Sequence, residues 1–153
     1  MQCTGRQVTA LIWLGGVQAV AADGLVILRS SNGPKETMNR LEAEVTARGM
    51  TVFARVDHAA GAADVGLQLR PTEVLIFGNA KAGTPLMQSM QTIGIDLPLK
   101  ALVWQDASGS TWLSYNDPSR LAKRHGEGSE SDAAVRAMAA ALDSVARAAT
   151  TSH

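Results

Sequence analysis

Two strand-like runs separated by a short turn constrain the fold of this chain most. Residues 100–105 and 110–115 are rich in residues of high strand propensity, and only Asp106-Ala107-Ser108-Gly109 lies between them. A connection this short joins antiparallel strands, because parallel neighbours need a crossover of a dozen or more residues. The chain is therefore predicted to contain a β-hairpin within an antiparallel sheet.

Two further segments have the continuous apolar character of strands. Residues 24–29 read Gly-Leu-Val-Ile-Leu-Arg, and residues 72–77 read Thr-Glu-Val-Leu-Ile-Phe. The second run ends in four consecutive apolar residues, a pattern consistent with a strand that is buried on both faces. We therefore expect Val74 and Ile76 both to be buried.

A fifth strand is predicted from alternation. In residues 51–57 the side chains of Val52, Ala54 and Val56 fall on one face and those of the intervening residues on the other. This is the pattern of a half-buried strand. Residues 58–69, rich in Ala and Gly, are compatible with a short helix that follows it.

Helices are indicated before and after the group of strands. Pro34 suits the first turn of a helix that ends at Gly49. Asp117 followed by Pro118 is an N-cap and first-position pair that begins another helix. Apolar residues at helical spacing after residue 132 predict a last one.

The order of elements predicts the fold class. One strand, a helix, four strands and then helices give an α+β domain, β-α-β-β-β-β-α, with a mostly antiparallel sheet and helices packed on one face. Aromatic residues make up only 4% of the chain, so aliphatic residues and Met must build its core. We assign residues 22–153 to this single domain.

The first 21 residues have the pattern of a bacterial signal peptide. Arg6 precedes a mostly apolar run over residues 8–21, and Ala19-Val20-Ala21 supplies the small-x-small cleavage pattern. The run of about 14 residues is short of the roughly 20 that a membrane-spanning helix needs. The mature chain is therefore predicted to be periplasmic or secreted, without a membrane span. The alternative is that the run forms a first strand or helix of the core.

Charge and cysteine content restrict the function classes. Basic and acidic residues number 14 each, with no visible basic stripe, so nucleic-acid binding is not expected. The single cysteine, Cys3, lies in the predicted signal peptide, which excludes disulfides, thiolate metal sites and a thiol nucleophile from the mature chain. The histidines lack the spacing of a helical zinc motif. No metal and no cofactor is predicted.

The sequence from Thr51 to Gly126 resembles the domain-of-unknown-function 302 family. The motifs that carry the resemblance agree in order and spacing: Asp57-His58-Ala59-Ala60-Gly61-Ala62, Gly66-Leu67-Gln68-Leu69-Arg70-Pro71-Thr72-Glu73, Phe77-Gly78-Asn79, Gly83-Thr84-Pro85-Leu86-Met87, Ile95-Asp96-Leu97-Pro98-Leu99-Lys100, Tyr115-Asn116-Asp117-Pro118 and Arg124-His125-Gly126. The resemblance implies a β-α-β-β-β-β-α arrangement of the TATA-binding-protein-like kind. It implies no known catalytic residue, and the likeness of fold is no indication of DNA binding.

Polar residues are predicted to gather at one edge of the sheet. Asn79 follows the 72–77 strand and Lys100 begins the next one, so antiparallel pairing places them at the same edge. The returning strand brings Tyr115 and Asn116 to that edge. We expect the hydroxyl of Tyr115 to lie in solvent.

Three further residues complete the candidate ligand-binding set. His125 ends the helix that leaves the same edge, about 12 Å from its start by helix geometry. Asp96 is either the partner of Lys100 in an ion pair or a charged anchor for a ligand. His58 follows a strand and either hydrogen-bonds a turn or contributes to the site.

Two functional hypotheses remain open, and a third is weaker. The first is a non-catalytic module that binds a small molecule or a protein, supported by the absence of a recognisable catalytic constellation. The second is an enzyme with an uncharacterised polar site at the sheet edge near residues 78–100 and with catalytic residues unknown. The third is a homodimer formed through this long connection, whose apolar stripe comprises Leu86, Met87 and Met90.

Overall fold

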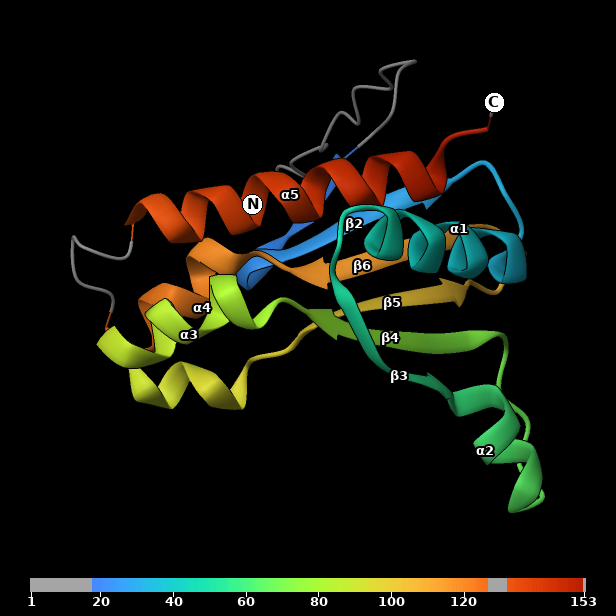
Figure 1. Cartoon of the computed structure of the whole chain (residues 1–153). Helices are drawn as coiled ribbons and strands as arrows, with labels where there is room; N and C mark the ends of the chain where they lie inside the picture. The colour runs from blue at the N-terminus through green and yellow to red at the C-terminus, as the bar shows by residue number, and fades with distance from the viewer. Residues whose placement is uncertain (1–17, 127–131, 153) are drawn as a thin grey trace, which may run out of the picture.

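The fold is a six-stranded antiparallel sheet with its two long helices on one face. A computed structural model describes residues 18–126 and 132–152 (Figure 1). The strands lie in the order β1-β2-β6-β5-β4-β3, with every neighbouring pair antiparallel. Their bounds are β1 Gln18–Ala21, β2 Leu25–Ser30, β3 Thr51–Asp57, β4 Thr72–Gly78, β5 Leu99–Gln105 and β6 Thr111–Asn116.

The helices divide into a covering pair and a group at the ends of the sheet. The pair, α1 and α5, packs side by side over the sheet, which confirms the α+β class with helices on one face (Figure 1). The helix bounds are α1 Pro34–Ala47, α2 His58–Asp64, α3 Ala80–Ser89, α4 Pro118–Arg124 and α5 Asp132–Thr150, with 3₁₀ turns η1 Ala22–Gly24 and η2 Gln91–Ile95. Among the described residues, no helix combines the length and the apolar composition needed to cross a membrane.

The N-terminal segment contributes one strand beyond the five assigned to the domain, as the alternative interpretation of its apolar run allowed. Most of the predicted signal peptide, residues 1–17, lies outside the described residues. Its last four residues form β1, which pairs with β2 from Gln18↔Leu28 to Ala21↔Leu25. The remaining five strands are those expected from the sequence.

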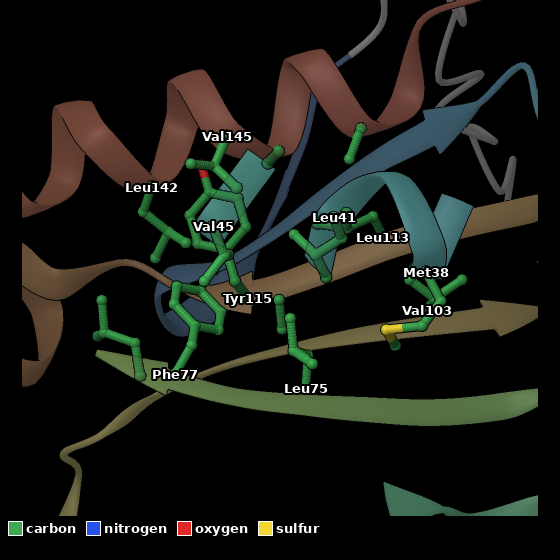
Figure 2. Packing of buried hydrophobic residues seen from close by; sticks show 14 of the residues in the cluster. Met38, Leu41, Val45, Leu75, Phe77, Val103, Leu113, Tyr115, Leu142 and Val145 are labelled. Atoms are coloured by element: carbon green, nitrogen blue, oxygen red, sulfur yellow. The ribbon is translucent and has the colours of Figure 1, made fainter. Parts of the chain in front are cut away.

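Aliphatic side chains and a few aromatic rings fill the space between the sheet and the covering helices (Figure 2). The sheet contributes Leu75 and Phe77 from β4, both fully buried, and α1 contributes Met38, Leu41 and Val45. The core thus depends on aliphatic residues, as the low aromatic content predicts.

The strand β4 is buried on one face only, which corrects the prediction for Val74 and Ile76. These two side chains alternate with the buried Leu75 and Phe77 and point away from the helices, where they stay partly exposed. A continuous apolar run had suggested burial on both faces. No long helix of the described residues lies over that second face.

A β-bulge between Val52 and Ala54 overturns the predicted common face of β3. Val52 lies opposite Phe77 and packs against the core, whereas Ala54 lies opposite Ile76 on the other face. Residues directly opposite each other in neighbouring strands share a face. Because the bulge adds one residue, the side chains after it face the opposite side of the sheet from the one that simple alternation predicts. Phe53, at the bulge, is 58% exposed.

One glycine fixes the junction between β2 and α4. Gly24 has φ +85°, and a Cβ at this position would lie only 2.3 Å from Cγ of Arg120 in α4. Its carbonyl accepts a hydrogen bond of 2.7 Å from the N–H of Asp117. Only glycine satisfies both the positive φ and the close approach.

Candidate functional site

An apolar cavity of about 250 Å³ lies at the end of the sheet where β4 stops. Phe77 separates it from the central core, and Met138 and Leu142 of α5 form one side. The helix α3 contributes Gly83 and Met87, and the segment 97–99 closes the opposite side. Figure 2 shows Phe77 and Leu142 toward the same end of the core. The lining is almost entirely apolar.

Glycines keep the cavity open. A Cβ added at Gly83 would contact Cδ1 of Leu97 at 3.6 Å, and one added at Gly78 would contact Cβ of Pro98 at 3.4 Å. A Cβ at either position would thus contact residues that line the cavity, and a larger side chain would compete for the same space. The glycine-rich segment 78–84 comprises the end of β4 and the first half of α3.

Asn79 combines a structural role with a place at the cavity. Its side-chain oxygen accepts a 2.8 Å hydrogen bond from the N–H of Lys81 and so caps α3. Asn79 and Thr84 also line the cavity and are exposed. They supply polar groups at the rim of an apolar chamber.

The predicted polar edge exists, but its members lie on different faces. The pairs Phe77↔Leu99 and Ala101↔Tyr115 place Asn79, Lys100 and Tyr115 near the same end of the sheet. Lys100 and Asn116 line a second hollow of about 270 Å³ on the face opposite the helices. Asn79 lines the apolar cavity instead, so the candidate residues do not converge on one chamber.

The Tyr115 hydroxyl is buried, which overturns the expectation that it lies in solvent. Tyr115 is 5% exposed and its ring packs in the core below α5 (Figure 2). The hydroxyl lies 3.5 Å from Oδ1 of Asp143. Burial, together with the negative charge of Asp143, raises the pKa of Tyr115 to about 12.

Asp96 and His125 contact each other directly. Both belong to the predicted ligand-binding set, but their contact was not predicted. Nε2 of His125 lies 2.5 Å from Oδ2 of Asp96, and their side chains are 9% and 16% exposed. Nδ1 of His125 lies 3.0 Å from Oγ1 of Thr92, and Arg124 approaches Asp96 at 3.5 Å. This cluster ties η2 to the C-terminal end of α4. Of the two roles predicted for Asp96, the ion pair with Lys100 is replaced by pairing with His125 and Arg124.

Thr92 was missed because no motif in the sequence marks it. Its hydroxyl, the imidazole and the carboxylate form a chain with the order of a nucleophile, a base and an orienting acid.

His58 lies far from this cluster. It is exposed and begins α2 at the opposite end of the sheet, after the Asp57↔Glu73 pair. Within the described ranges, no cluster of three or more His, Cys, Asp or Glu is arranged to hold a metal ion.

Comparisons with known proteins give the relatives of this chain. Residues 26–145 match the family described as "Domain of unknown function DUF302". The chain is also 48% identical over 129 residues to "Fluoride-specific ion channel FluC 1" of Brucella suis biovar 1 (strain 1330), covering 84% of this chain and 51% of that protein. "Fluoride-specific ion channel FluC 2" of Brucella melitensis biotype 1 shows the same identity over the same length, with 48% of that protein covered. The chain thus spans about half the length of the curated relatives that it matches.

A solved structure has the same fold. The crystal structure of an uncharacterized conserved protein DUF302 from Bacillus stearothermophilus superposes with a TM-score of 0.66 at 23% sequence identity. The match covers 83% of this chain and 95% of that chain. At this identity the likeness concerns the arrangement of the elements.

Proposed function

This chain belongs to the DUF302 family, and on that premise we propose that it is a non-catalytic binding module for a small apolar molecule. The observation that supports the proposal is the cavity between β4, α3 and α5, which is lined by Phe77, Met87, Met138 and neighbouring apolar groups. Concave, mostly apolar chambers with a few polar groups at the rim are the usual form of small-molecule sites. Transfer of each CH₂ group into such a chamber contributes about 0.8 kcal/mol.

Thermal stabilisation by small aliphatic ligands tests this function. A ligand that binds only the folded state raises the melting temperature, so n-octanol and shorter alkanols are expected to raise it in a concentration-dependent manner. Gly83→Leu would fill the cavity and is expected to abolish the shift. The matched control is Gly61→Leu in α2, where an added Cβ meets nothing within 4 Å.

The proposal fails if none of these alkanols raises the melting temperature of the parent chain. It also fails if Gly83→Leu, folded by circular dichroism, responds to octanol as strongly as Gly61→Leu does. A response lost only in Gly83→Leu supports binding in the cavity.

We also propose that the module acts outside the cytoplasm. The support is the signal-peptide pattern of Arg6, the apolar run and Ala19-Val20-Ala21. Cleavage after Ala21 would remove β1 and leave β2 as the edge strand. The intact mass of the protein from its native host decides the question, since a cytoplasmic species that retains residues 1–21 contradicts it.

The similarity to proteins named fluoride-specific ion channels supports a proposed partner. We propose that the domain works beside such a channel, because about half of each of those proteins is 48% identical to it. Deleting the domain in a channel-bearing host is expected to change growth at inhibitory fluoride concentrations. If the deletion strain grows as the parent strain does at every fluoride concentration, the proposed partnership with the channel is contradicted.

An enzymatic function is the second candidate, favoured by the Thr92–His125–Asp96 chain. In such a site the imidazole would take the proton of the Thr92 hydroxyl as that oxygen attacks the acyl carbon, and would return the proton to the leaving alcohol or phenol as its ester bond breaks; water would then release the acyl group from Thr92. Hydrolysis of p-nitrophenyl acetate tests it, with Thr92→Ala and Asp96→Asn expected to lose activity and Thr92→Ser to retain it. Equal rates in all four proteins would remove this candidate.

A further inference from the structure

The face of the sheet opposite α1 and α5 is mainly apolar, with Arg29, Lys100 and Asn116 as exposed polar side chains toward its ends. We define the uncovered face by the large apolar side chains that point away from these helices: Leu25, Ile27, Val56, Val74, Ile76, Leu102, Trp104 and Trp112. Leu25 and Val56 are 36% and 39% exposed, and the others are partly exposed. Large contiguous apolar surface of this kind marks an interaction site.

Two tryptophans make one end of the uncovered face rigid. The rings of Trp104 and Trp112 stack with centroids 6.0 Å apart and an interplanar angle of 23°. Nε1 of Trp104 donates to Oγ of Ser114 at 2.8 Å, and Nε1 of Trp112 donates to Oδ2 of Asp106 at 2.8 Å. Both polar groups of the pair are therefore satisfied within the chain, and the rings present apolar surface.

Opposite charges stand at the two ends of the central strand β5. Lys100 lies at its beginning, exposed and beside the hollow of about 270 Å³. Asp106 follows its end and is held ionised by its hydrogen bonds. Six residues of strand separate the two charges by about 20 Å.

We propose that the uncovered face binds the same face of a second copy of this chain. The twofold axis lies between the two sheets, perpendicular to β5 and level with its middle. The two copies of β5 therefore run in opposite directions, and Lys100 of each copy meets Asp106 and the tryptophan pair of the other. Such an interface is self-complementary, as twofold symmetry requires. Each lysine gains an ion pair with a carboxylate and a cation–π contact with an indole ring.

The size of the face predicts a reversible dimer. Five strands about 4.8 Å apart and six residues long span about 24 by 20 Å, or roughly 500 Å² in each copy. The two copies together bury about 1,000 Å², near the lower limit of specific interfaces. The dimer is therefore expected to form with rising protein concentration.

Asp106 favours a second copy over an anionic membrane as the occupant. Its carboxylate lies beside Trp112 at the end of the face where aromatic rings would enter a lipid headgroup layer. A negative charge there is repelled by anionic lipid but attracted by Lys100 of a second copy. Arg29 of β2, exposed and opposite Trp112, also stands at this end and donates a hydrogen bond to Oγ of Ser110. In the twofold arrangement, Asp106 is the acidic group that Lys100 of the second copy meets.

Sedimentation equilibrium of the full chain, from low micromolar to submillimolar concentration, tests the dimer. The parent is expected to shift from monomer to dimer, with a blue shift of tryptophan fluorescence over the same range. Leu102→Glu on the uncovered face is expected to remain monomeric. The matched control is Ile95→Glu on η2, 73% exposed, which is expected to dimerise as the parent does.

Lys100 variants keep the test decisive if Leu102→Glu does not fold. Lys100→Glu is expected to weaken dimerisation at least tenfold, whereas Lys100→Arg retains it. The proposal is overturned if the parent stays monomeric, or if Ile95→Glu disrupts the dimer and Leu102→Glu does not. Flotation of the monomeric parent with vesicles of anionic phospholipid, lost in Leu102→Glu, overturns it in favour of a membrane surface.

Discussion

The two faces of the sheet are built from alternate residues of the same strands, yet their environments differ. In β4, Leu75 and Phe77 are fully buried under α1 and α5, whereas Val74 and Ile76 are partly exposed on the uncovered face. The four side chains are all apolar, so composition does not separate them. The difference comes from the layer above each face, which for the described residues is present on one side only.

The same contrast governs ionisation at the two faces. Tyr115 on the helix-covered face has a raised pKa because burial disfavours the phenolate. Asp106, beside the uncovered face, has a pKa lowered to about 2 by hydrogen bonds from the Ser108 hydroxyl and the Trp112 indole. Burial thus disfavours ionisation of the Tyr115 hydroxyl, whereas hydrogen bonds favour the ionised carboxylate of the solvent-exposed Asp106.

Truncating matched residues of β4 should separate the faces most strongly. Phe77→Ala creates a cavity in the core and is expected to cost about 3–5 kcal/mol of unfolding free energy. Ile76→Ala removes a partly exposed side chain and is expected to cost less than half as much. Urea denaturation at low protein concentration measures both, and equal losses would show that the uncovered face is as buried as the core.

Alkaline pH should reveal the buried hydroxyl of Tyr115. The folded pKa of about 12 exceeds the ordinary value of 10.0, so the unfolded chain loses this proton first as pH rises. The stability contributed by Tyr115 is therefore complete below pH 10 and is lost between about pH 10 and pH 12. Tyr115→Phe should lack this part of the pH dependence.

Absorbance at the phenolate band reports this pKa directly, because Tyr115 is the single tyrosine of the chain. A midpoint near 10 in the folded protein would contradict the burial of the hydroxyl.

Acid pH should have the opposite effect through Asp106. The folded pKa of about 2 is below the ordinary value of 3.8, so the unfolded chain binds this proton first as pH falls. The contribution of Asp106 is complete above about pH 4 and is lost between about pH 4 and pH 2. Because the carboxylate lies in a turn open to solvent, we expect a small decrease in melting temperature, absent in Asp106→Asn. An identical acid profile in the parent and the variant would refute the assignment.

A polar substitution on the uncovered face should have the smallest effect. Val74→Thr keeps the shape and the strand propensity of the side chain at a position that is partly exposed in the monomer. The unfolding free energy of the monomer is expected to stay within about 0.5 kcal/mol of the parent. The matched core substitution Val103→Thr buries a hydroxyl and should be clearly destabilising.

Local patterns predicted most of the fold. Asp117 caps α4 as expected, its Oδ1 accepting a 2.9 Å hydrogen bond from the N–H of Ser119, and β5 and β6 pair across the predicted turn. These features depend on a few neighbouring residues. The burial of Val74 and Ile76 was predicted wrongly, because a continuous apolar run does not show whether one or both faces of a strand are covered.

The candidate site depended on contacts between distant segments, so less of it could be predicted. Antiparallel pairing was enough to place Asn79 and Lys100 near one end of the sheet. The faces on which they lie, and the pairing of Asp96 with His125 across 29 positions, are set by packing between elements. The apolar cavity is lined by several separate segments and has no pattern of its own in the sequence.

The position of β2 between β1 and β6 has a consequence for synthesis of the chain. Arg29 of β2 donates a hydrogen bond to Ser110, which is 81 positions later in the sequence, and β2 pairs with β6 along its whole length. During translation, the apolar segment Leu25–Ser30 emerges early but finds its main partner only after β6 has left the ribosome. Closing so long a loop is slow, and an apolar strand whose edge toward β6 is still unpaired is prone to aggregate. The nascent chain is therefore expected to remain open until nearly all of it has been made, which makes it a natural client for a holdase chaperone.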